Sequence, residues 1–450
     1  MAKAFFGGIQ PNDMKAATNG KAIYPIPSPK QVIIHLARRG QEPCRPMVSV
    51  GDRVKLGQQI GEPVDEESVA VHASVSGVVT AVEPRPHAAG GKVPAVVIEN
   101  DFRNELCRDI RQVEEPAGLS LQEMLERIRA AGVMCSDSDD LPAHIKIAKG
   151  VGTVDTLIVN GTESEPYLTA DHRTMLERPG QIIDGCTFLA KMFRLDKVII
   201  GVEVNKKNGI VALKQEIADK RAPVVVTPLG SRYPQGSDKQ LCQAITGRQI
   251  PPGAPPEEIG CAVFDIQTVC DIYRAVSVGL PVVRRIVTVA GSGVMEPGNV
   301  ECPVGTPVSC LLDACGGLRE KTFKLIVGGP MTGTAQSDVN VPVDRDISAV
   351  LAFAGREGRG LKHSACIRCG RCLRVCPMHL QPLFLYRYAV EGRLDALETA
   401  NIMDCMECGA CAYVCPARLP LVRVFSEGKA RLMEEWAEQE AAEEEKEAEV

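Results

Sequence analysis

The chain has 450 residues, enough for roughly two to four domains, since a domain usually takes about 100–200 residues. Its formal net charge of −6 excludes a nucleic-acid-binding surface over the whole molecule, because neutralising phosphates takes an excess of Lys and Arg, although a local basic patch stays compatible with it. No stretch approaches the ~18 consecutive apolar residues of a membrane span and the N-terminus has no secretory signal, so we expect a cytoplasmic protein without a transmembrane segment.

Residues 1–110 contain short β-rich runs separated by Gly-Asp and Ser-Gly turns. The pattern PMVSVGDRVKLGQQIGE followed by VHASVSGVVTAV resembles the barrel-sandwich fold of biotinyl and lipoyl carrier domains. A carrier needs an exposed Lys at a hairpin tip, and the intervening PVDEESVAV has none. We therefore expect a structural barrel-sandwich hybrid domain here.

Residues 115–280 alternate between helical and strand-like segments, from LQEMLERIRAAG and TLIVNG to KVIIGVE and PVVVTPL. The alternation predicts an α/β domain with a largely parallel sheet, whose ligands gather at the carboxyl ends of the strands. The turn GVMCSDSDDLPAHIK, at 132–146, lies where such a domain can cradle a phosphate, and an ordinary solvated turn is the alternative.

A second loop of this domain, NGTESEPYLTADHR, follows a predicted strand directly and carries Glu163 and Glu165. Two carboxylates at a strand end can hydrogen-bond ribose hydroxyls or flank a redox ring, whereas paired loop carboxylates elsewhere are often merely solvated. The segment SRYPQGSDKQ, at 231–240, is a further candidate at the same edge of the sheet.

Residues 281–335 read as strand, turn, strand, short helix and strand, from RRIVTVAGSGV to KLIVGGPMTG. This order predicts a small β-grasp (SLBB-like) domain. Residues 336–360 are polar and contain glycines, and we predict a linker there.

Eighteen cysteines are many for a cytoplasmic protein, where a disulfide framework does not persist, so we expect metal binding. Ten of them are scattered, and a scattered Cys is usually a small buried hydrophobe. The other eight form two runs, CIRCGRCLRVCP and CMECGACAYVCP, each with the pattern C-x2-C-x2-C-x3-C-P.

In this pattern three thiolates wrap one [4Fe–4S] cluster, and the fourth Cys, followed by Pro, ligates the other cluster. The predicted ligands of the first cluster are Cys366, Cys369, Cys372 and Cys415. Those of the second cluster are Cys405, Cys408, Cys411 and Cys376. A pair of structural zinc sites is the alternative, but zinc explains neither the third regularly spaced Cys nor the Cys-Pro of both runs.

Between the two runs apolar residues recur at spacings of three and four, which favours helices. Residues 361–430 are therefore predicted to form a helical ferredoxin domain that conducts electrons and makes or breaks no bond to carbon. The acidic tail at 431–450 is predicted to be a solvated helix or a frayed end.

The domain order, together with FFGGIQP, NGTESEPYLTADHR, YPQGSDKQL, GGPMTG and the double cysteine run, resembles the RnfC subunit of the Rnf-type ion-translocating electron transport complex over nearly the whole chain. That family is similar to the NADH-oxidising flavoprotein subunit of respiratory complex I. The resemblance implies a peripheral subunit on the cytoplasmic side of the cell membrane. It would exchange electrons with NAD(H) through FMN and pass them through two clusters to membrane-embedded and flavin/Fe–S subunits, with ferredoxin at the opposite terminus and Na⁺ or H⁺ as the pumped ion.

The resemblance also implies roles for single residues. Lys146 matches a lysine expected near the flavin phosphate, and Glu163 and Glu165 match carboxylates expected around the flavin and nicotinamide. Residues 135–140, Cys-Ser-Asp-Ser-Asp-Asp, replace the glycine-rich run of the family, and Asp265 replaces an asparagine. No catalytic side chain is implied.

Both departures act against binding of a phosphate. Glycines let backbone N–H groups approach the phosphate closely, and a like-charge contact at ~4 Å costs on the order of 4 kcal/mol at an effective dielectric near 20. We therefore hypothesise that binding of FMN and NAD(H) is weakened or lost, whereas electron transfer through the clusters persists.

Two other functions compete with this interpretation. One is a soluble flavin- and Fe–S-dependent cobalamin reductase, and the other is a non-catalytic scaffold whose clusters relay electrons between other proteins. FFGGIQP and the barrel-sandwich segment favour the membrane-complex subunit, because those reductases look as if they begin near the α/β domain.

Overall fold

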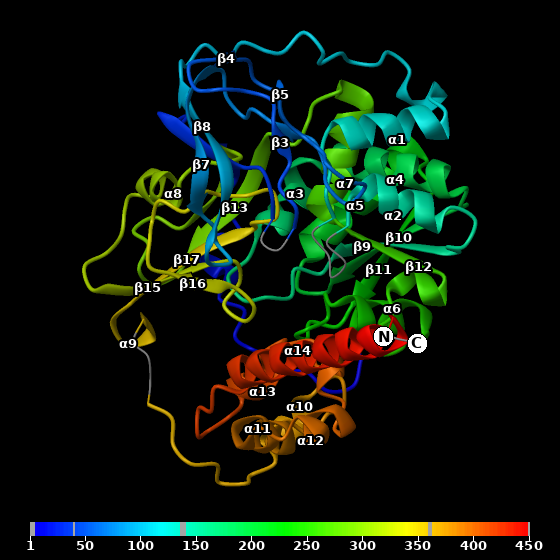
Figure 1. Cartoon of the computed structure of the whole chain (residues 1–450). Helices are drawn as coiled ribbons and strands as arrows, with labels where there is room; N and C mark the ends of the chain where they lie inside the picture. Colours follow the sequence, from blue (N-terminus) through cyan, green and yellow to red (C-terminus); the bar gives the residue numbers. More distant parts are fainter. Residues whose placement is uncertain (1–4, 39–40, 136–140, 359–361, 449–450) are drawn as a thin grey trace.

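The described part of the chain forms four sheets flanked by helices, with a helical module at one end (Figure 1). The computed structural model describes residues 5–38, 41–135, 141–358 and 362–448. Within these ranges no helix combines the length and the apolar character that a membrane crossing needs.

Two small antiparallel sheets in residues 31–100 have the arrangement expected of a barrel sandwich. One sheet has the order β2-β8-β7-β4 and the other β3-β5-β6. Their inner faces share one core that includes Ile34, Ile60 and Val96. The strands are β2 (Gln31–His35), β3 (Arg45–Pro46), β4 (Arg53–Val54), β5 (Gln59–Glu62), β6 (Val71–His72), β7 (Gly77–Pro86) and β8 (Lys92–Asn100).

The α/β domain has a sheet of order β11-β10-β9-β12 in which all neighbours are parallel, as the alternation predicts. Because parallel strands end at one edge, Asn160 and Asp265 become register partners there. Helices α1, α2, α4 and α7 share a core with one face of the sheet, and α6 packs on the other. The elements are α1 (Leu121–Ala130), α2 (Ala143–Gly150), β9 (Thr156–Gly161), α3 (Ala170–Glu177), α4 (Pro179–Phe193), β10 (Val198–Glu203), α5 (Lys207–Lys220), β11 (Val224–Leu229), α6 (Asp238–Thr246), β12 (Cys261–Asp265) and α7 (Ile266–Tyr273).

The third domain is a sheet of order β1-β14-β13-β17-β15-β16 with α8 beside it. The prediction of a linker at 336–360 is wrong, because the apolar run AVLAFA within it forms β17, a strand held between β13 and β15. Polar neighbours on both sides hid this short strand from the composition of the segment. The elements are β1 (Ile23–Pro25), β13 (Arg284–Ala290), β14 (Gly298–Pro303), α8 (Val308–Ala314), β15 (Thr322–Val327), β16 (Thr334–Gln336), β17 (Ala349–Ala354) and α9 (Gly355–Gly358).

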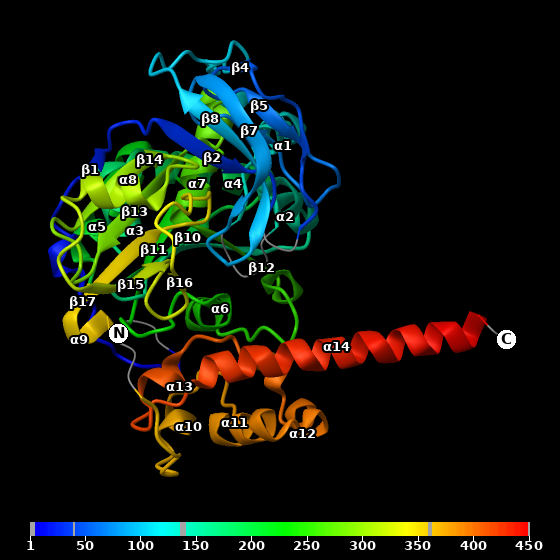
Figure 2. The same ribbon diagram turned by 60° about the vertical axis from the view of Figure 1, so that its left-hand side comes forward.

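The C-terminal module is helical, and its last helix continues through the acidic tail away from the other domains (Figure 2). Its core contains Leu385, Leu397 and Phe425, which come from three different helices. The helices are α10 (Arg371–Val375), α11 (Pro382–Glu391), α12 (Leu394–Thr399), α13 (Ala410–Tyr413) and α14 (Leu421–Ala448).

The N-terminal segment joins this helical module to the α/β domain. Ile9 exchanges two backbone hydrogen bonds with Tyr233 of the α/β domain, at 2.8 and 2.9 Å. The N–H group of Gly8 donates to the carbonyl oxygen of Val375, at the end of α10, at 2.9 Å. The segment FFGGIQP therefore forms a bridge between two domains.

Two glycines make this bridge sterically feasible. Gly7 and Gly8 have φ of 84° and 70°, which favours glycine. A Cβ on Gly7 would lie 2.9 Å from the carbonyl oxygen of Cys376, and one on Gly8 would lie 2.5 Å from that of Tyr233. Both distances are too short for a side chain, so the bridge requires Gly at each position.

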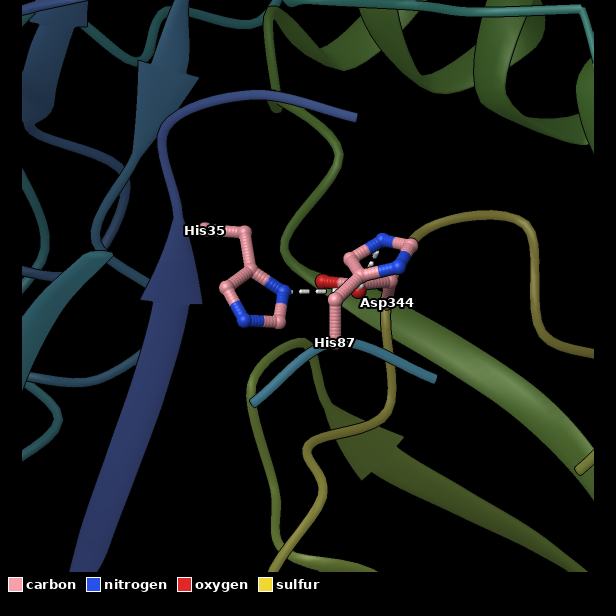
Figure 3. Close-up of side chains that lie close together, drawn as sticks. All are labelled: His35, His87 and Asp344. Carbon is pink, nitrogen blue, oxygen red and sulfur yellow. Dashed lines mark hydrogen bonds and ion pairs between the residues drawn. The ribbon is translucent and has the colours of Figure 1, made fainter. Parts of the chain in front are cut away.

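Three polar side chains link the barrel sandwich to the third domain (Figure 3). The carbonyl oxygen of Pro86 accepts a hydrogen bond from Nε2 of His35 at 3.1 Å, and Nδ1 of His35 lies 2.8 Å from Oδ2 of Asp344. Nδ1 of His87 accepts from the N–H group of Ala89 at 3.1 Å, so its proton is on Nε2, 3.4 Å from the same carboxylate oxygen. Since Nε2 of His87 has no free lone pair for a cation, we interpret the three residues as an interdomain latch and not as a metal site.

The latch favours a charged His35. Burial alone would lower the pKa of His35, but the carboxylate of Asp344 and the carbonyl of Pro86 outweigh it and raise the pKa above 6.5. Burial opposes the charge of Asp344 too, yet His35 holds its pKa below 3.8. Both partners are therefore ionised near neutral pH.

We predict that His35→Ala lowers the free energy of unfolding by about 3 kcal/mol at about pH 6, because Asp344 then stays behind without its counter-charge. A raised folded-state pKa gives stability that is complete below 6.5 and is lost as pH rises through that pKa. The gap between the two proteins in thermal unfolding midpoint should therefore narrow towards about pH 9. His363→Ala, at an exposed histidine, is the control, and a gap that does not change with pH would contradict a charged His35.

Candidate functional site

Two hollows in the helical module are each lined by four cysteines. The first, of about 400 Å³, is lined by Cys366, Cys369, Cys372 and Cys415. The second, of about 380 Å³, is lined by Cys376, Cys405, Cys408 and Cys411. The structure thus brings the eight cysteines together in the two groups predicted from their spacing, with the last Cys of each run in the hollow of the other run.

Local backbone geometry brings the thiols to the hollows. Gly370 and Gly409, with φ of 69° and 76°, precede α10 and α13 and turn the chain sharply after the second Cys of each run. The third Cys, Cys372 or Cys411, then lies in the short helix that follows. The same turn in both runs gives the two hollows the same local construction.

The donor sets fit iron–sulfur clusters. Burial raises the pKa of Cys408 to about 11, and the neighbouring Cys405 and Cys376 raise it further. Four such thiols around one hollow cannot all ionise unless a cation offsets their charge, and metal binding deprotonates thiols outright. The two hollows differ in exposure, because Cys366 and Cys369 are exposed whereas Cys408 and Cys411 are buried.

A third, larger hollow lies at the carboxyl ends of β9 and β12, against the second cysteine group. Its volume is about 1390 Å³ including the open mouth, above the about 300–1,000 Å³ of common ligand sites. Thr332 of the third domain and Met406 of the helical module complete its wall. Cys408 lines both this hollow and that of the second cysteine group, so a ligand here would adjoin that group.

Glu165, one of the predicted binding residues, is already engaged by the protein. Oε2 accepts a hydrogen bond from the N–H group of Met331 at 2.9 Å, and Oε1 accepts one from the hydroxyl of Thr332. A Cβ on Gly329 would lie 1.9 Å from Oε2, so glycine is needed for this approach. Glu165 therefore positions the loop GGPMTG at the edge of the hollow.

Glu163, the second predicted carboxylate, is held in a strained loop by buried cations. Its φ is 43°, and its own carbonyl oxygen accepts from Nζ of Lys15 at 2.8 Å. Nζ of Lys206 donates to the carbonyl of Thr162 at 2.5 Å. Oε1 of Glu163 accepts from the N–H group of Asp171 at 2.8 Å, and Oε2 lies 3.8 Å from Nζ of Lys15.

The lining of the third hollow is acidic. Among the described residues no Lys or Arg lines it, whereas five carboxylates do, namely Glu163, Glu165, Asp171, Asp238 and Asp265. Burial raises the pKa of Asp171, and the nearby charges of Glu163 and Asp265 raise it further. Asp265 also caps α7, because its Oδ1 accepts from the N–H group of Thr268 at 2.9 Å.

Lys146, predicted near a phosphate, lies elsewhere. It is buried on α2, with Nζ 3.9 Å from Oε1 of Glu257 and 5.6 Å from the ring centre of Phe264. It is not among the described residues that line the third hollow. Of the replaced run at 135–140, Cys135 is buried and residues 136–140 lie outside the described residues.

The sequence interpretation missed residues that matter in this hollow. Asp171 lies within the segment that was singled out, but it belongs to a helix and its neighbours come from other elements. Lys15 carries no local signal, because the carbonyl that it binds is 148 residues away in the chain.

Four family models match the chain, each within one predicted domain. They are the RnfC barrel sandwich hybrid domain over residues 3–103, the Nuo51 FMN-binding domain over 128–274, the SLBB domain over 286–335 and the 4Fe-4S dicluster domain over 365–419.

Relatives match over most of their length. The chain is 38% identical over 409 residues, 90% of this chain and 88% of the relative, to the RnfC subunit of the proton-translocating ferredoxin:NAD(+) oxidoreductase complex of Clostridium ljungdahlii. It is 38% identical over 401 residues, 89% of this chain and 90% of the relative, to the corresponding subunit of the Na(+)-translocating complex of Acetobacterium woodii. An NAD+-reducing [NiFe]-hydrogenase structure is similar with a TM-score of 0.50 and 14% identity, covering 66% of this chain and 60% of that one, which shows the fold alone.

We predict that Asp171→Asn stabilises the chain at alkaline pH relative to wild type. The folded state holds the proton of Asp171 more tightly than the unfolded state, so this carboxyl lowers stability as pH rises from 3.8 to its raised pKa. The variant should keep a flatter profile of thermal midpoint against pH. Asp219→Asn, on the exposed side of α5, is the control, and parallel profiles for wild type and Asp171→Asn would contradict the prediction.

Proposed function

Because the chain belongs to the RnfC family, the subunits of ion-translocating ferredoxin:NAD(+) oxidoreductase complexes that its relatives represent, we propose that it is the peripheral electron-transfer subunit of such a complex. In this proposal it lies on the cytoplasmic side of the cell membrane and contacts membrane-embedded and flavin/Fe–S subunits. Those partners couple the electron transfer to movement of Na⁺ or H⁺. The chain contributes a conductor and no catalytic side chain.

The observation that carries this function is the pair of four-cysteine hollows. We propose that each holds a [4Fe–4S] cluster, the first ligated by Cys366, Cys369, Cys372 and Cys415, and the second by Cys405, Cys408, Cys411 and Cys376. Each cluster supplies a one-electron centre. The similar volumes of the hollows, about 400 and 380 Å³, support groups of the same size.

The surroundings of the clusters suggest a direction for the wire. The second cluster adjoins the third hollow through Cys408, whereas the first has the exposed ligands Cys366 and Cys369. Electrons would therefore pass between the interior side, at the second cluster, and an external partner at the first.

The family implies FMN in the third hollow, but its described lining does not fit the phosphate. All charged side chains there are carboxylates, and even the N-terminus of α6, a feature that usually attracts anions, places Asp238 against the hollow. We therefore propose that binding of FMN and NAD(H) is weakened and that the second cluster exchanges electrons with another subunit. This favours an electron-relay subunit, and the barrel-sandwich match over residues 3–103 disfavours a soluble cobalamin reductase.

We predict that crossed ligation can be read from cysteine variants. Cys376→Ala and Cys408→Ala should remove the same EPR signal of the dithionite-reduced protein, whereas Cys372→Ala should remove the other one. Iron should fall from about eight atoms per chain to about four in each variant. Cys310→Ala, at a half-buried cysteine outside both runs, is the control, and loss of one common signal in Cys376→Ala and Cys372→Ala would show uncrossed ligation.

We predict that the purified protein contains less than stoichiometric FMN and that its clusters are not reduced by NADH. Asp265→Asn removes one negative charge from the hollow and keeps the cap of α7, since Asn caps as well as Asp. It should tighten FMN binding about tenfold, which corresponds to about 1.4 kcal/mol. Fluorescence titration with FMN measures the effect, and stoichiometric FMN together with NADH-reducible clusters in wild type would refute the weakened site.

A further inference from the structure

Positive charge gathers around the first cysteine run of a chain that is acidic overall. Between Glu357 and Glu391 the sequence has no Asp or Glu, and five positive side chains occur from Lys362 to Arg387. In the second run Asp404 and Glu407 flank the cysteines instead. The two cluster sites therefore present opposite charge to their surroundings.

The structure places four arginines of this region around the exposed cluster. Arg368 and Arg371 line the hollow of the first cysteine group. Arg371, Arg374 and Arg418 line a shallow groove beside it, and Cys415 lines both. None of the four forms an ion pair with a described residue within 4.0 Å, so their charge is directed at solvent. We call these four residues the arginine face.

Apolar side chains lie between the arginines. Ile367 is 67% exposed and Tyr413, which lines the groove, is 56% exposed. Arginine and aromatic residues are enriched in protein interfaces, and arginine pairs with carboxylates in two parallel hydrogen bonds. The arginine face thus has the composition of a small interface for an acidic partner.

We propose that the arginine face docks a small acidic redox protein that carries carboxylates around its own redox centre. This deepens the proposed function and rests on it, because the first cluster must be present. In the complex, the reduced centre of the partner loses one electron and the oxidised first cluster gains it. The opposite charges speed the encounter, and the small area allows rapid release, as in other transient electron-transfer pairs.

The charge also argues for a protein over a membrane surface. The arginines surround the cluster itself, where a lipid headgroup would leave the exposed ligands without an electron partner. An acidic redox protein uses the same charges and brings its centre to the place where Cys366 and Cys369 are exposed. Vesicle binding serves as a competing outcome of the test.

The test compares two double charge reversals in the full-length holoprotein. Arg374→Glu/Arg418→Glu changes the arginine face without altering a residue that lines the cluster hollow. Lys207→Glu/Lys214→Glu changes two exposed lysines of α5. Each removes two positive and adds two negative charges, so both take the net charge from −6 to −10 and differ only in location.

Stopped-flow spectroscopy follows reduction of the clusters by a reduced acidic [4Fe–4S] ferredoxin at low and high salt. We expect the arginine-face variant to lose at least about tenfold in second-order rate constant at low salt, with the loss shrinking at high salt as charges are screened. The lysine variant should stay within about twofold of wild type. Reduction by dithionite and iron content should be the same in all three proteins.

The outcomes separate the two levels of the argument. Wild type without dithionite-reducible iron overturns the proposed function itself. Intact clusters with equal ferredoxin rates in both double variants overturn only the docking proposal. Co-sedimentation of wild type, but not of the arginine-face variant, with vesicles of anionic phospholipid, together with unchanged ferredoxin rates, assigns the face to the membrane and also overturns it.

Discussion

The relation between the cluster module and the rest of the chain depends on a close approach of three backbones at Gly7 and Gly8. A side chain at either glycine would collide with a carbonyl, of Cys376 on one side or Tyr233 on the other. Tyr233 in turn donates its hydroxyl to the carbonyl of Cys408 at 2.6 Å, so the same tyrosine touches both the bridge and a cluster ligand. The second cluster site and the third hollow keep their common wall because this junction fixes them together.

Features encoded locally were predictable, and features built from distant segments were not. Cysteine spacing predicted both groups of thiols, because a run of twelve residues determines its own turn. Alternation of segments predicted the parallel sheet and hence the edge where Glu163 and Asp265 meet. By contrast β17 is too short to stand out from its polar neighbours, and Lys15 acquires its role only when remote carbonyls fold around it. Lys146 shows the converse error, since the motif around it persists while its side chain packs outside the hollow.

A modest net charge conceals two strongly polar ends of one electron path. Carboxylates converge on the third hollow beside the second cluster site, and arginines surround the first. A reduced cluster carries extra negative charge, so the acidic end disfavours an electron and the basic end favours it. The charge distribution is therefore compatible with an electron resting near the exterior of the molecule, where a partner can collect it or deliver it.

Crossed ligation has a consequence for how the module is built. Under the proposed ligation each run gives three ligands to one cluster and one ligand to the other, so neither cluster is complete until both runs are in place. Insertion of iron and sulfide should thus be cooperative, with few half-loaded chains. Damage by oxygen at the exposed first cluster would also free Cys415 from its place and loosen the chain around the buried one. The exposed cluster then acts as the weak point that sets the lifetime of both.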